Sequence, residues 1–130
     1  MARHVVPPHQ AARPVGPYSQ AVRAGGLVFL SGQLPIGPGG DLVREPPERA
    51  LEACFENVKA ALSDAGLTLD DVVLVTLYLA DLDNFARINE AYRRIFPENP
   101  PARVTVEVSR LPLEAPLEVQ VVAAEEEKPG

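Results

Sequence analysis

Residues 101–112 begin and end in proline and alternate apolar with polar residues. β-Branched valines at every second position predict a β-strand, whose side chains point alternately to opposite faces. One face of this strand would carry Val104, Val106 and Val108, and the other Arg103, Thr105, Glu107 and Ser109. The stretch therefore predicts a strand with an apolar face and a polar face.

Arg103 stands directly after Pro-Pro-Ala, so its backbone has little freedom and its guanidinium group is aimed. A planar fork of N–H donors can hold a carboxylate through two parallel hydrogen bonds. A solvated arginine at the rim of a strand is the alternative, and the commoner case for such spacing. Both interpretations stay open at this point.

The chain of 130 residues predicts a single domain, residues 1–130. Its net charge is −6 and its 12 basic residues are dispersed, which argues against nucleic acid as the main partner. No apolar run is long enough to cross a bilayer and the N-terminus lacks an apolar signal core, so we expect a cytoplasmic protein without a membrane partner. The single cysteine, Cys54, excludes an internal disulfide.

The two ends of the chain are expected to be irregular. Residues 1–14 have little periodicity, although residues 3–6 could add a short edge strand. The charged tail, residues 125–130, is expected to fray. No cysteine or acidic residue stands at metal-ligand spacing with His4 or His9, so we expect surface histidines and no metal site.

A hairpin is predicted where Gly25-Gly26 separates two strands, residues 20–24 and 27–31. The second strand runs into Ser31-Gly32-Gln33. A glycine at this place allows a ligand or another backbone to approach closely, or permits a bulge.

Two amphipathic helices are predicted. The first begins near Pro47 and stops at Gly66, with a buried stripe of Leu51, Cys54, Phe55, Val58, Leu62 and Ala65. The second is capped by Asp81 or Asp83 and stops at Pro97, with a stripe of Phe85, Ile88, Tyr92, Ile95 and Phe96. Cys54 therefore reads as a small buried residue, whereas Asn89 lies off the second stripe.

The nearly continuous apolar run of residues 72–80 predicts a central strand covered on both faces, and residues 117–124 predict a last strand. The element order predicts an α/β (α+β) two-layer sandwich, a mixed sheet with two helices on one face. The other face would carry Arg103, Thr105, Glu118 and Gln120 among apolar neighbours such as Val122. A half-apolar face of this kind indicates self-association.

The last two strands could form a simple hairpin. Glu118 would then lie opposite residues 107–109, about 13–20 Å from Arg103 at roughly 3.3 Å per residue. The two residues could share a site only if another strand intervenes or if chains from different subunits meet. We therefore expect a site near a subunit boundary.

Five motifs together resemble the Rid family, the YjgF-type reactive-intermediate (enamine/imine) deaminases. They are Gly16-Pro17-Tyr18-Ser19-Gln20-Ala21-Val22, Ser31-Gly32-Gln33-Leu34-Pro35, Asn57-Val58 with Ala65-Gly66-Leu67, Asn89-Glu90-Ala91-Tyr92, and Pro101-Ala102-Arg103 through Val106-Glu107-Val108. The resemblance covers residues 15–124 in unbroken order. It implies a chorismate-mutase-like homotrimer with clefts between subunits.

The resemblance also implies roles for single residues. Arg103 matches the carboxylate-binding arginine and Glu118 the water-positioning glutamate, and the cleft would be lined by Tyr18, Ser31, Gly32, Asn89 and Thr105. Many members have cysteine where this chain has Thr105, so a thiol is not essential. Some members have a second glutamate where this chain has Gln120, which puts an acid/base role there in doubt.

The chemistry implied is hydrolysis of reactive 2-enamine and 2-imine acids, of the 2-aminoacrylate and 2-iminobutanoate type, to 2-keto acids and ammonia. Pyridoxal-phosphate dehydratases release such compounds, and a 2-iminobutanoate/2-iminopropanoate deaminase removes them as metabolite damage control. The substrate is already activated, so no metal or organic cofactor is expected.

Two other function classes stay open. One is an RNA-directed endoribonuclease or translation inhibitor, an activity ascribed to some relatives, which the acidic balance of this chain disfavours. The other is a non-catalytic keto-acid-binding or chaperone-like trimer, which turnover would distinguish from a deaminase.

Overall fold

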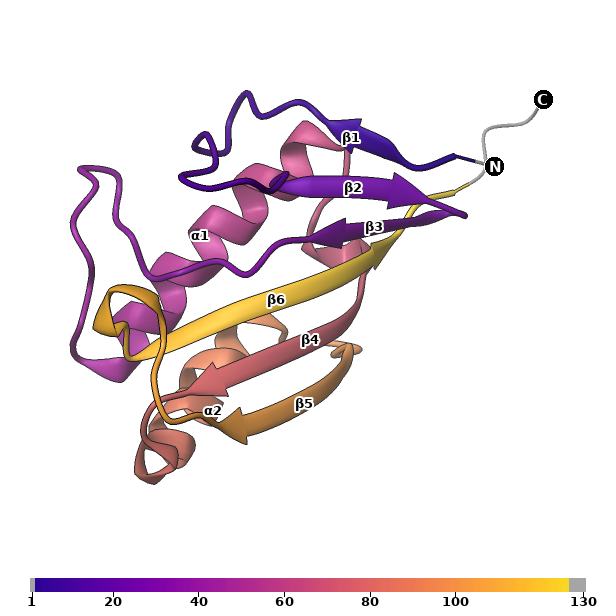
Figure 1. The fold of residues 1–130 in the computed structure, drawn as a ribbon. Coiled ribbons are helices and arrows are strands. Elements are labelled where there is room, and N and C mark those ends of the chain that lie inside the picture. Colours follow the sequence, from indigo (N-terminus) through magenta and orange to yellow (C-terminus); the bar gives the residue numbers. More distant parts are fainter. Residues whose placement is uncertain (1, 127–130) are drawn as a thin grey trace.

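The computed structural model describes residues 2–126, which form a mixed six-stranded sheet with two helices. The strands are β1 (His4–Val6), β2 (Ala21–Ala24), β3 (Leu27–Leu30), β4 (Val72–Leu79), β5 (Ala102–Glu107) and β6 (Leu117–Ala124). Their order across the sheet is β1-β2-β3-β6-β4-β5 (Figure 1). Neighbouring strands are antiparallel except β4 and β5, which are parallel.

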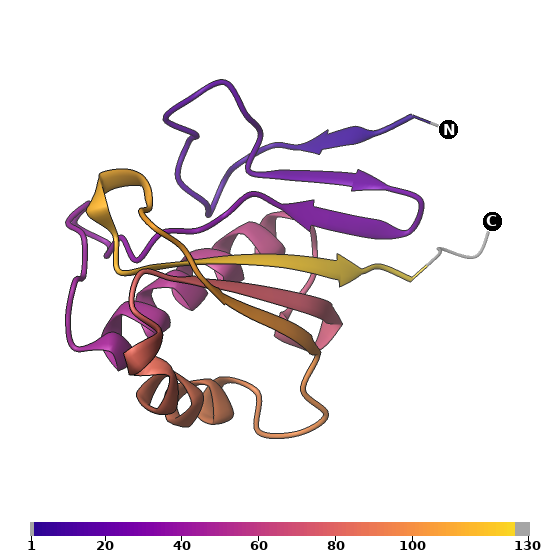
Figure 2. The same cartoon turned by 60° about the horizontal axis from the view of Figure 1, so that its bottom comes forward.

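Helices α1 (Pro47–Asp64) and α2 (Phe85–Ile95) lie on the same side of the sheet (Figures 1 and 2). Three short 3₁₀ segments, Leu69–Asp71, Leu82–Asn84 and Pro112–Glu114, lie in the connections. Helix α2 provides the crossover that parallel strands require, since a tight turn cannot join them. The predicted two-layer sandwich is therefore confirmed, and we call the side of the sheet that faces the helices the helix face.

The ends of α1 follow from its sequence. Pro47 is its first residue, where a missing N–H breaks no helical hydrogen bond. At the other end Gly66 adopts φ +79°, and the Leu67 N–H donates to the Leu62 carbonyl over 2.9 Å. This left-handed closure confirms Gly66 as the stop.

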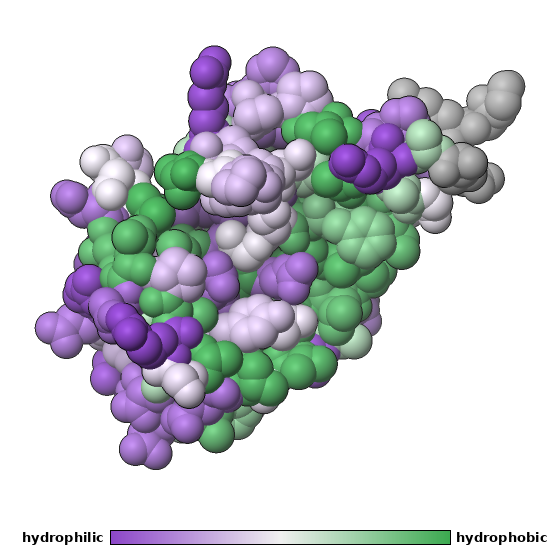
Figure 3. Space-filling view, in the orientation of Figure 1, coloured by the Kyte–Doolittle hydropathy of each residue, from purple (hydrophilic) through white to green (hydrophobic). Residues whose placement is uncertain are grey.

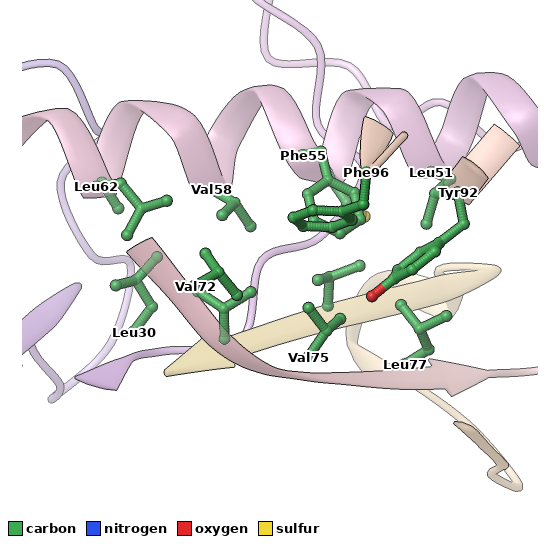
Figure 4. Packing of buried hydrophobic residues seen from close by; sticks show 14 of the residues in the cluster. Leu30, Leu51, Phe55, Val58, Leu62, Val72, Val75, Leu77, Tyr92 and Phe96 are labelled. Atoms are coloured by element: carbon green, nitrogen blue, oxygen red, sulfur yellow. The ribbon is translucent and has the colours of Figure 1, made fainter. Parts of the chain in front are cut away.

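The core lies between α1, α2 and the helix face (Figure 4). It contains the predicted buried residues of α1, among them Leu51, Phe55 and Val58, and their partners on the sheet. Cys54 is fully buried there. Burial raises the pKa of the Cys54 thiol well above its ordinary value, and the Glu118 carboxylate adds to the rise. Cys54 is thus a core residue and not a nucleophile.

The N-terminal half agrees with the predicted hairpin and edge strand. Gly25 and Gly26 take φ values of 59° and 79° at the tip between β2 and β3, as a two-residue turn of this kind requires. Strand β1 pairs with β2 at the edge of the sheet. The predicted cap of α2 by Asp81 or Asp83 is wrong: Asp81 accepts the Asp83 N–H and caps the 3₁₀ turn before α2, and α2 itself begins after Asn84 without a side-chain cap.

The simple hairpin supposed for the last two strands does not form, and the alternative of an intervening strand holds. Strand β6 lies between β3 and β4, and β4 separates β6 from β5 (Figure 1). Residues 108–116 connect β5 to β6, and a connection this long does not specify a hairpin. The connection carries the chain past β4, so that β6 pairs with the other edge of β4. Leu117, Val119 and Val121 of β6 are buried in the core.

The prediction that β4 is covered on both faces is also wrong for the single chain. Val75, Leu77 and Leu79 are buried on the helix face, whereas Val73 is 44% exposed and Tyr78 is half-buried. An apolar run indicates that both faces of a strand are removed from water, but it does not indicate whether a helix or another chain covers each face. We call the uncovered side of the sheet the open face. The register places on it Phe29, Leu74, Thr76, Tyr78, Val104, Val106, Glu118, Gln120 and Val122.

The ends of the described chain are more ordered than the sequence indicates. The Glu125 N–H donates to the Gly26 carbonyl over 2.9 Å, and its carboxylate lies 3.8 Å from Arg23 Nε. Residues 127–130 of the predicted frayed tail lie outside the described residues. Near the N-terminus, the N–H groups of His9, Gln10 and Ala11 all donate to the Asp64 carboxylate.

Within residues 2–126, no helix combines the length and apolar character that crossing a membrane would need. The expected cytoplasmic location stays a prediction.

Candidate functional site

Glu118 and Gly32 are in direct contact at the start of β6. A Cβ atom built on Gly32 would lie 2.7 Å from the carboxyl carbon of Glu118 and 3.1 Å from its Cγ. Such distances are shorter than real Cβ contacts, so only glycine fits beside the carboxylate in its present position. The group that approaches Gly32 is a side chain, whereas the sequence analysis had considered a ligand, another backbone or a bulge.

The segment after Gly32 is fixed by backbone pairing and by a buried amide. Gln33 and Val119 exchange two backbone hydrogen bonds of 2.7 and 3.0 Å, which attach the segment to β6. The buried Gln33 side chain donates to Gln20 Oε1 over 2.9 Å and to the Ser31 carbonyl over 3.1 Å. This network holds Gly32 over Glu118. The pairing of the two glutamines was not predicted, because it joins segments 13 residues apart and no local pattern indicates it.

Ser31 and Tyr18 adjoin the same place. The Ser31 hydroxyl donates to the Ser19 carbonyl over 2.6 Å, which links the end of β3 to the loop before β2. Tyr18 immediately precedes Ser19 and is 46% exposed. Its ring is therefore accessible beside the segment that carries Ser31 and Gly32.

The electrostatics of Glu118 follow from its half-buried position. Burial raises the pKa of the Glu118 carboxyl above its ordinary value. The ion pairs within residues 2–126 are formed by Glu125, Glu56, Glu48, Glu90 and Glu114, not by Glu118. A half-buried carboxylate without a cationic partner is a stronger base than an exposed one.

Arg103 lies in a second group of residues, between β5 and α2. Its guanidinium carbon lies 4.8 Å from the ring centroid of Tyr92 and 5.5 Å from that of Phe85. Both distances are typical of cation–π contact. The two rings belong to the predicted core stripe of α2, but their contact with Arg103 was not predicted. Their spacing of seven residues, which puts them on one side of a helix, was the available signal.

Thr105 and Asn89 belong to this second group. Thr105 is half-buried on β5, and its hydroxyl oxygen is buried without a hydrogen-bond partner among the described residues. Asn89 lies on α2, four residues after Phe85 and three before Tyr92, so it shares their side of the helix, and its placement off the second stripe is wrong. The sequence-predicted site residues thus divide into two groups.

The two groups lie on opposite faces of the sheet, so the predicted common face for Arg103 and Glu118 is wrong. On β4, Val75 is the partner of Arg103 and Tyr78 is the partner of Glu118. Val75 is buried on the helix face, and paired residues share a face.

The assignment of Thr105 to the open face is wrong for the same reason. The valines of β5 point the other way, and Val104 and Val106 are 48% and 38% exposed on the open face. β5 is an edge strand. The alternation of its residues assigns each side chain to one of two faces, but it does not determine which face packs against the helices. Gln120 does lie on the open face with Glu118, as predicted.

The open face is largely apolar. Phe29 of β3 is 43% exposed and lies opposite Val122 of β6, whose other partner is Leu74 of β4. Figure 3 shows this face, with hydrophobic residues around a smaller polar region. The expected half-apolar face therefore exists and includes Val122 as predicted, and Val104 and Val106 of β5 add to it.

Comparisons with known proteins give a consistent result. Residues 8–125 match the family model described as Endoribonuclease L-PSP. A RutC family protein from Pyrococcus abyssi is 46% identical over 127 residues, which cover 97% of this chain and 100% of that protein. A putative reactive intermediate deaminase, TdcF of Escherichia coli, is 37% identical over 125 residues, 93% of this chain and 96% of that protein.

Solved structures have the same fold. The crystal structure of E. coli TdcF with bound serine matches with a TM-score of 0.87 at 36% identity and covers 94% of this chain and 98% of that one. A putative endoribonuclease from Thermotoga maritima matches with a TM-score of 0.88 at 41% identity and covers 98% and 100% of the two chains.

Proposed function

Because this chain belongs to the Rid family of YjgF-type proteins, we propose that it hydrolyses 2-imine and 2-enamine acids to 2-keto acids and ammonia. The substrates would be small compounds of the 2-aminoacrylate and 2-iminobutanoate type, which pyridoxal-phosphate dehydratases release. A relative named as a putative reactive intermediate deaminase, with a structure that holds serine, supports a small ligand with a carboxylate and a nitrogen on the α-carbon.

The single observation that carries this proposal is the state of Arg103. Its guanidinium carbon lies over two rings, yet the ion pairs within residues 2–126 are formed by other cations, Arg23, Lys59, Arg87, Arg93 and Arg110. The N–H donors of Arg103 therefore stay free for a carboxylate, which they can bind in bidentate fashion.

Glu118 would handle the water. Its raised pKa makes it a better base near neutral pH than an exposed glutamate. Water attacks the imine carbon, the C=N electrons move to nitrogen, and Glu118 accepts the proton that water loses. Glu118 then returns this proton to nitrogen, which gives a carbinolamine. The hydroxyl proton of the carbinolamine passes through Glu118 to nitrogen as the C–N bond breaks, so that ammonia leaves, the carbonyl forms and Glu118 is again a carboxylate.

The site would be composite, with Arg103 from one subunit and Glu118 from its neighbour. In one chain these residues lie on opposite faces of the sheet with β4 between their strands. The apolar open face provides the surface for association, and we propose the homotrimer that the family resemblance implies. Light scattering should then give three times the chain mass of 14.0 kDa.

The remaining residues would line the cleft between subunits. Tyr18, Ser31 and Gly32 would come with Glu118, and Asn89 and Thr105 with Arg103. The exposed ring of Tyr18 could close over a bound substrate, and backbone groups at Ser31 and Gly32 could hold its nitrogen or carboxylate.

The test couples a threonine dehydratase to this protein and follows loss of the imine ahead of its spontaneous hydrolysis. Arg103→Ala should lower kcat/KM at least about a hundredfold, because two charge-assisted hydrogen bonds contribute about 1.5–3 kcal/mol each. Arg103→Lys should fail almost as badly, since an ammonium cannot replace the planar fork. Wild-type rates in a trimeric Arg103→Ala variant would refute the proposal.

The description Endoribonuclease L-PSP favours RNA as a second candidate substrate. The net charge of −6 opposes it, because RNA binding depends on a concentrated basic surface. RNA affinity that falls steeply with salt, together with cleavage, would support this second function. Saturable keto-acid binding without turnover would instead identify a non-catalytic trimer.

A further inference from the structure

We propose that Tyr92 and Phe85 are positioning residues for Arg103, and that their rings set the affinity of this protein for the substrate carboxylate. The inference rests on the proposed function. It adds two residues of α2 that have no contact with the reacting atoms and act through the guanidinium group.

The geometry of the three side chains supports this role. Tyr92 and Phe85 are seven residues apart, so they project from the same side of α2 after two turns. The guanidinium carbon of Arg103 lies within 4.8 and 5.5 Å of their ring centroids. Contact with two rings from one rigid helix restricts the orientation of the guanidinium plane more than one ring would.

Stacking holds an arginine without occupying its donors. An arginine fixed by a carboxylate would use two of its five N–H groups in that pair, whereas a ring contacts the face of the guanidinium and leaves its edge free. Arg103 is also spared a competing acid, since the ion-paired acids of the described residues contact other cations. The rings therefore orient Arg103 and leave its edge for the ligand.

Tyr92 is itself rigid. Its ring centroid lies 6.1 Å from that of Phe55 and 5.1 Å from that of Phe96, and the side chain is buried in the core cluster (Figure 4). Its hydroxyl is buried without a hydrogen-bond partner among the described residues. Burial raises the pKa of Tyr92 to about 12, and the nearby Arg103 opposes this rise. Tyr92 thus stays neutral, and the proposal assigns its function to the ring and not to the hydroxyl.

The experiment compares four variants. Tyr92→Leu and Phe85→Leu each remove one ring, and Tyr92→Phe keeps the ring but removes the hydroxyl. Phe96→Leu is the control for loss of a ring from the same cluster, because Phe96 is similarly buried there but, among the described residues, the cation–π contacts of Arg103 are with Tyr92 and Phe85. Phe85 is only partly buried, so Phe85→Leu remains informative if Tyr92→Leu fails to fold.

Two measurements test the role of the rings: the affinity for the ligand, and the NMR signal of the Arg103 guanidinium. Calorimetry with 2-ketobutyrate and steady-state kinetics should show Kd and KM rising about 3- to 30-fold in both ring-removal variants, the range for loss of one cation–π contact. kcat should change less, and Tyr92→Phe and Phe96→Leu should stay near wild type. In NMR spectra, the Arg103 Nε–H signal should carry a ring-current shift that Tyr92→Leu reduces and Tyr92→Phe keeps.

Several outcomes would overturn the inference. They are equal weakening by Phe96→Leu, loss of affinity in Tyr92→Phe, and an Arg103 signal without a ring-current shift in the wild type. If the wild type hydrolyses imines and Tyr92→Leu and Phe85→Leu leave KM unchanged, this inference alone fails. If the wild type binds 2-ketobutyrate with the expected order of variants but hydrolyses no imine, the proposed function alone fails.

Discussion

Arg103 and Glu118 lie on opposite faces of one sheet, attached to the same neighbouring strand through Val75 and Tyr78. Their strands are two positions apart, roughly 10 Å at the usual strand spacing. No rotation of either side chain can bring both groups to one small substrate on one face. If both act on the same molecule, they must come from different copies of the chain.

Subunit complementation tests this directly. Arg103→Ala and Glu118→Gln should each be nearly inactive alone. When the two are co-expressed, about a quarter of the interfaces in a cyclic oligomer should combine an intact Arg103 with an intact Glu118, so about a quarter of the wild-type activity should return. Activity is measured on the purified mixed oligomers. Absence of recovery in mixed oligomers would place both residues in one subunit's site.

Gly32→Ala should inactivate the protein without unfolding it. The new methyl group would lie 2.7 Å from the Glu118 carboxyl carbon, and the carboxylate, at the end of a flexible side chain, would move aside. Displacement of a catalytic group by about 1 Å costs up to about 100-fold in kcat. Gly39→Ala is the control, because a Cβ there meets nothing within 4 Å and the backbone needs no positive φ. Equal kcat values in both variants would show that the position of Glu118 is not critical.

Glu118→Gln should stabilise the fold at neutral pH. Because burial raises the pKa of Glu118 in the folded state, the unfolded chain binds protons less tightly, and the free energy of unfolding falls as pH rises through the ordinary glutamate pKa of about 4.3 and the raised folded value. Glutamine removes this penalty.

Thermal unfolding at a series of pH values measures this effect. The variant should have the higher Tm at pH 7, and its advantage should shrink below about pH 4. Glu52→Gln, at an exposed position on α1, serves as the control. A variant less stable than the wild type at pH 7 would contradict this account of Glu118.

Asp64→Ala should release the N-terminal segment. Burial of the Asp64 carboxyl opposes its ionisation, but the backbone N–H groups of Gln10, Ala11 and His9 outweigh this and lower its pKa. Loss of these charge-assisted bonds should cost about 1–3 kcal/mol of the free energy of unfolding at pH 7.

A lowered pKa contributes stability above the ordinary aspartate pKa of about 3.9, and that stability is lost as pH falls through the folded value. The difference between wild type and variant should therefore shrink in acid. Denaturant unfolding measures it, with Asp70→Asn as the control, because the Asp70 side chain forms none of the hydrogen bonds within residues 2–126. An undiminished difference at low pH would refute the charge-based explanation.

The elements of the fold could be predicted because their signals are local. Gly66 ends α1 and Gly25-Gly26 turns the hairpin through positive φ angles that other residues rarely adopt. The apolar stripes of both helices follow from the helical period, and Cys54 is buried because it stands in one of them. The alternation in β5 and β6 assigned each residue to one of two faces.

The choice between those faces was decided by the tertiary structure. The alternation of a strand is compatible with either face toward the helices, so the sequence allowed Arg103 or Val104 on the helix face. The pairing of Arg103 with Val75 decided between them. The contact of Gly32 with Glu118 likewise joins segments far apart in the chain, and that of Arg103 with Tyr92 joins a strand to the preceding helix. Local sequence determined which elements form and where they end. Long-range pairing, which no local pattern encodes, decided which side chains meet.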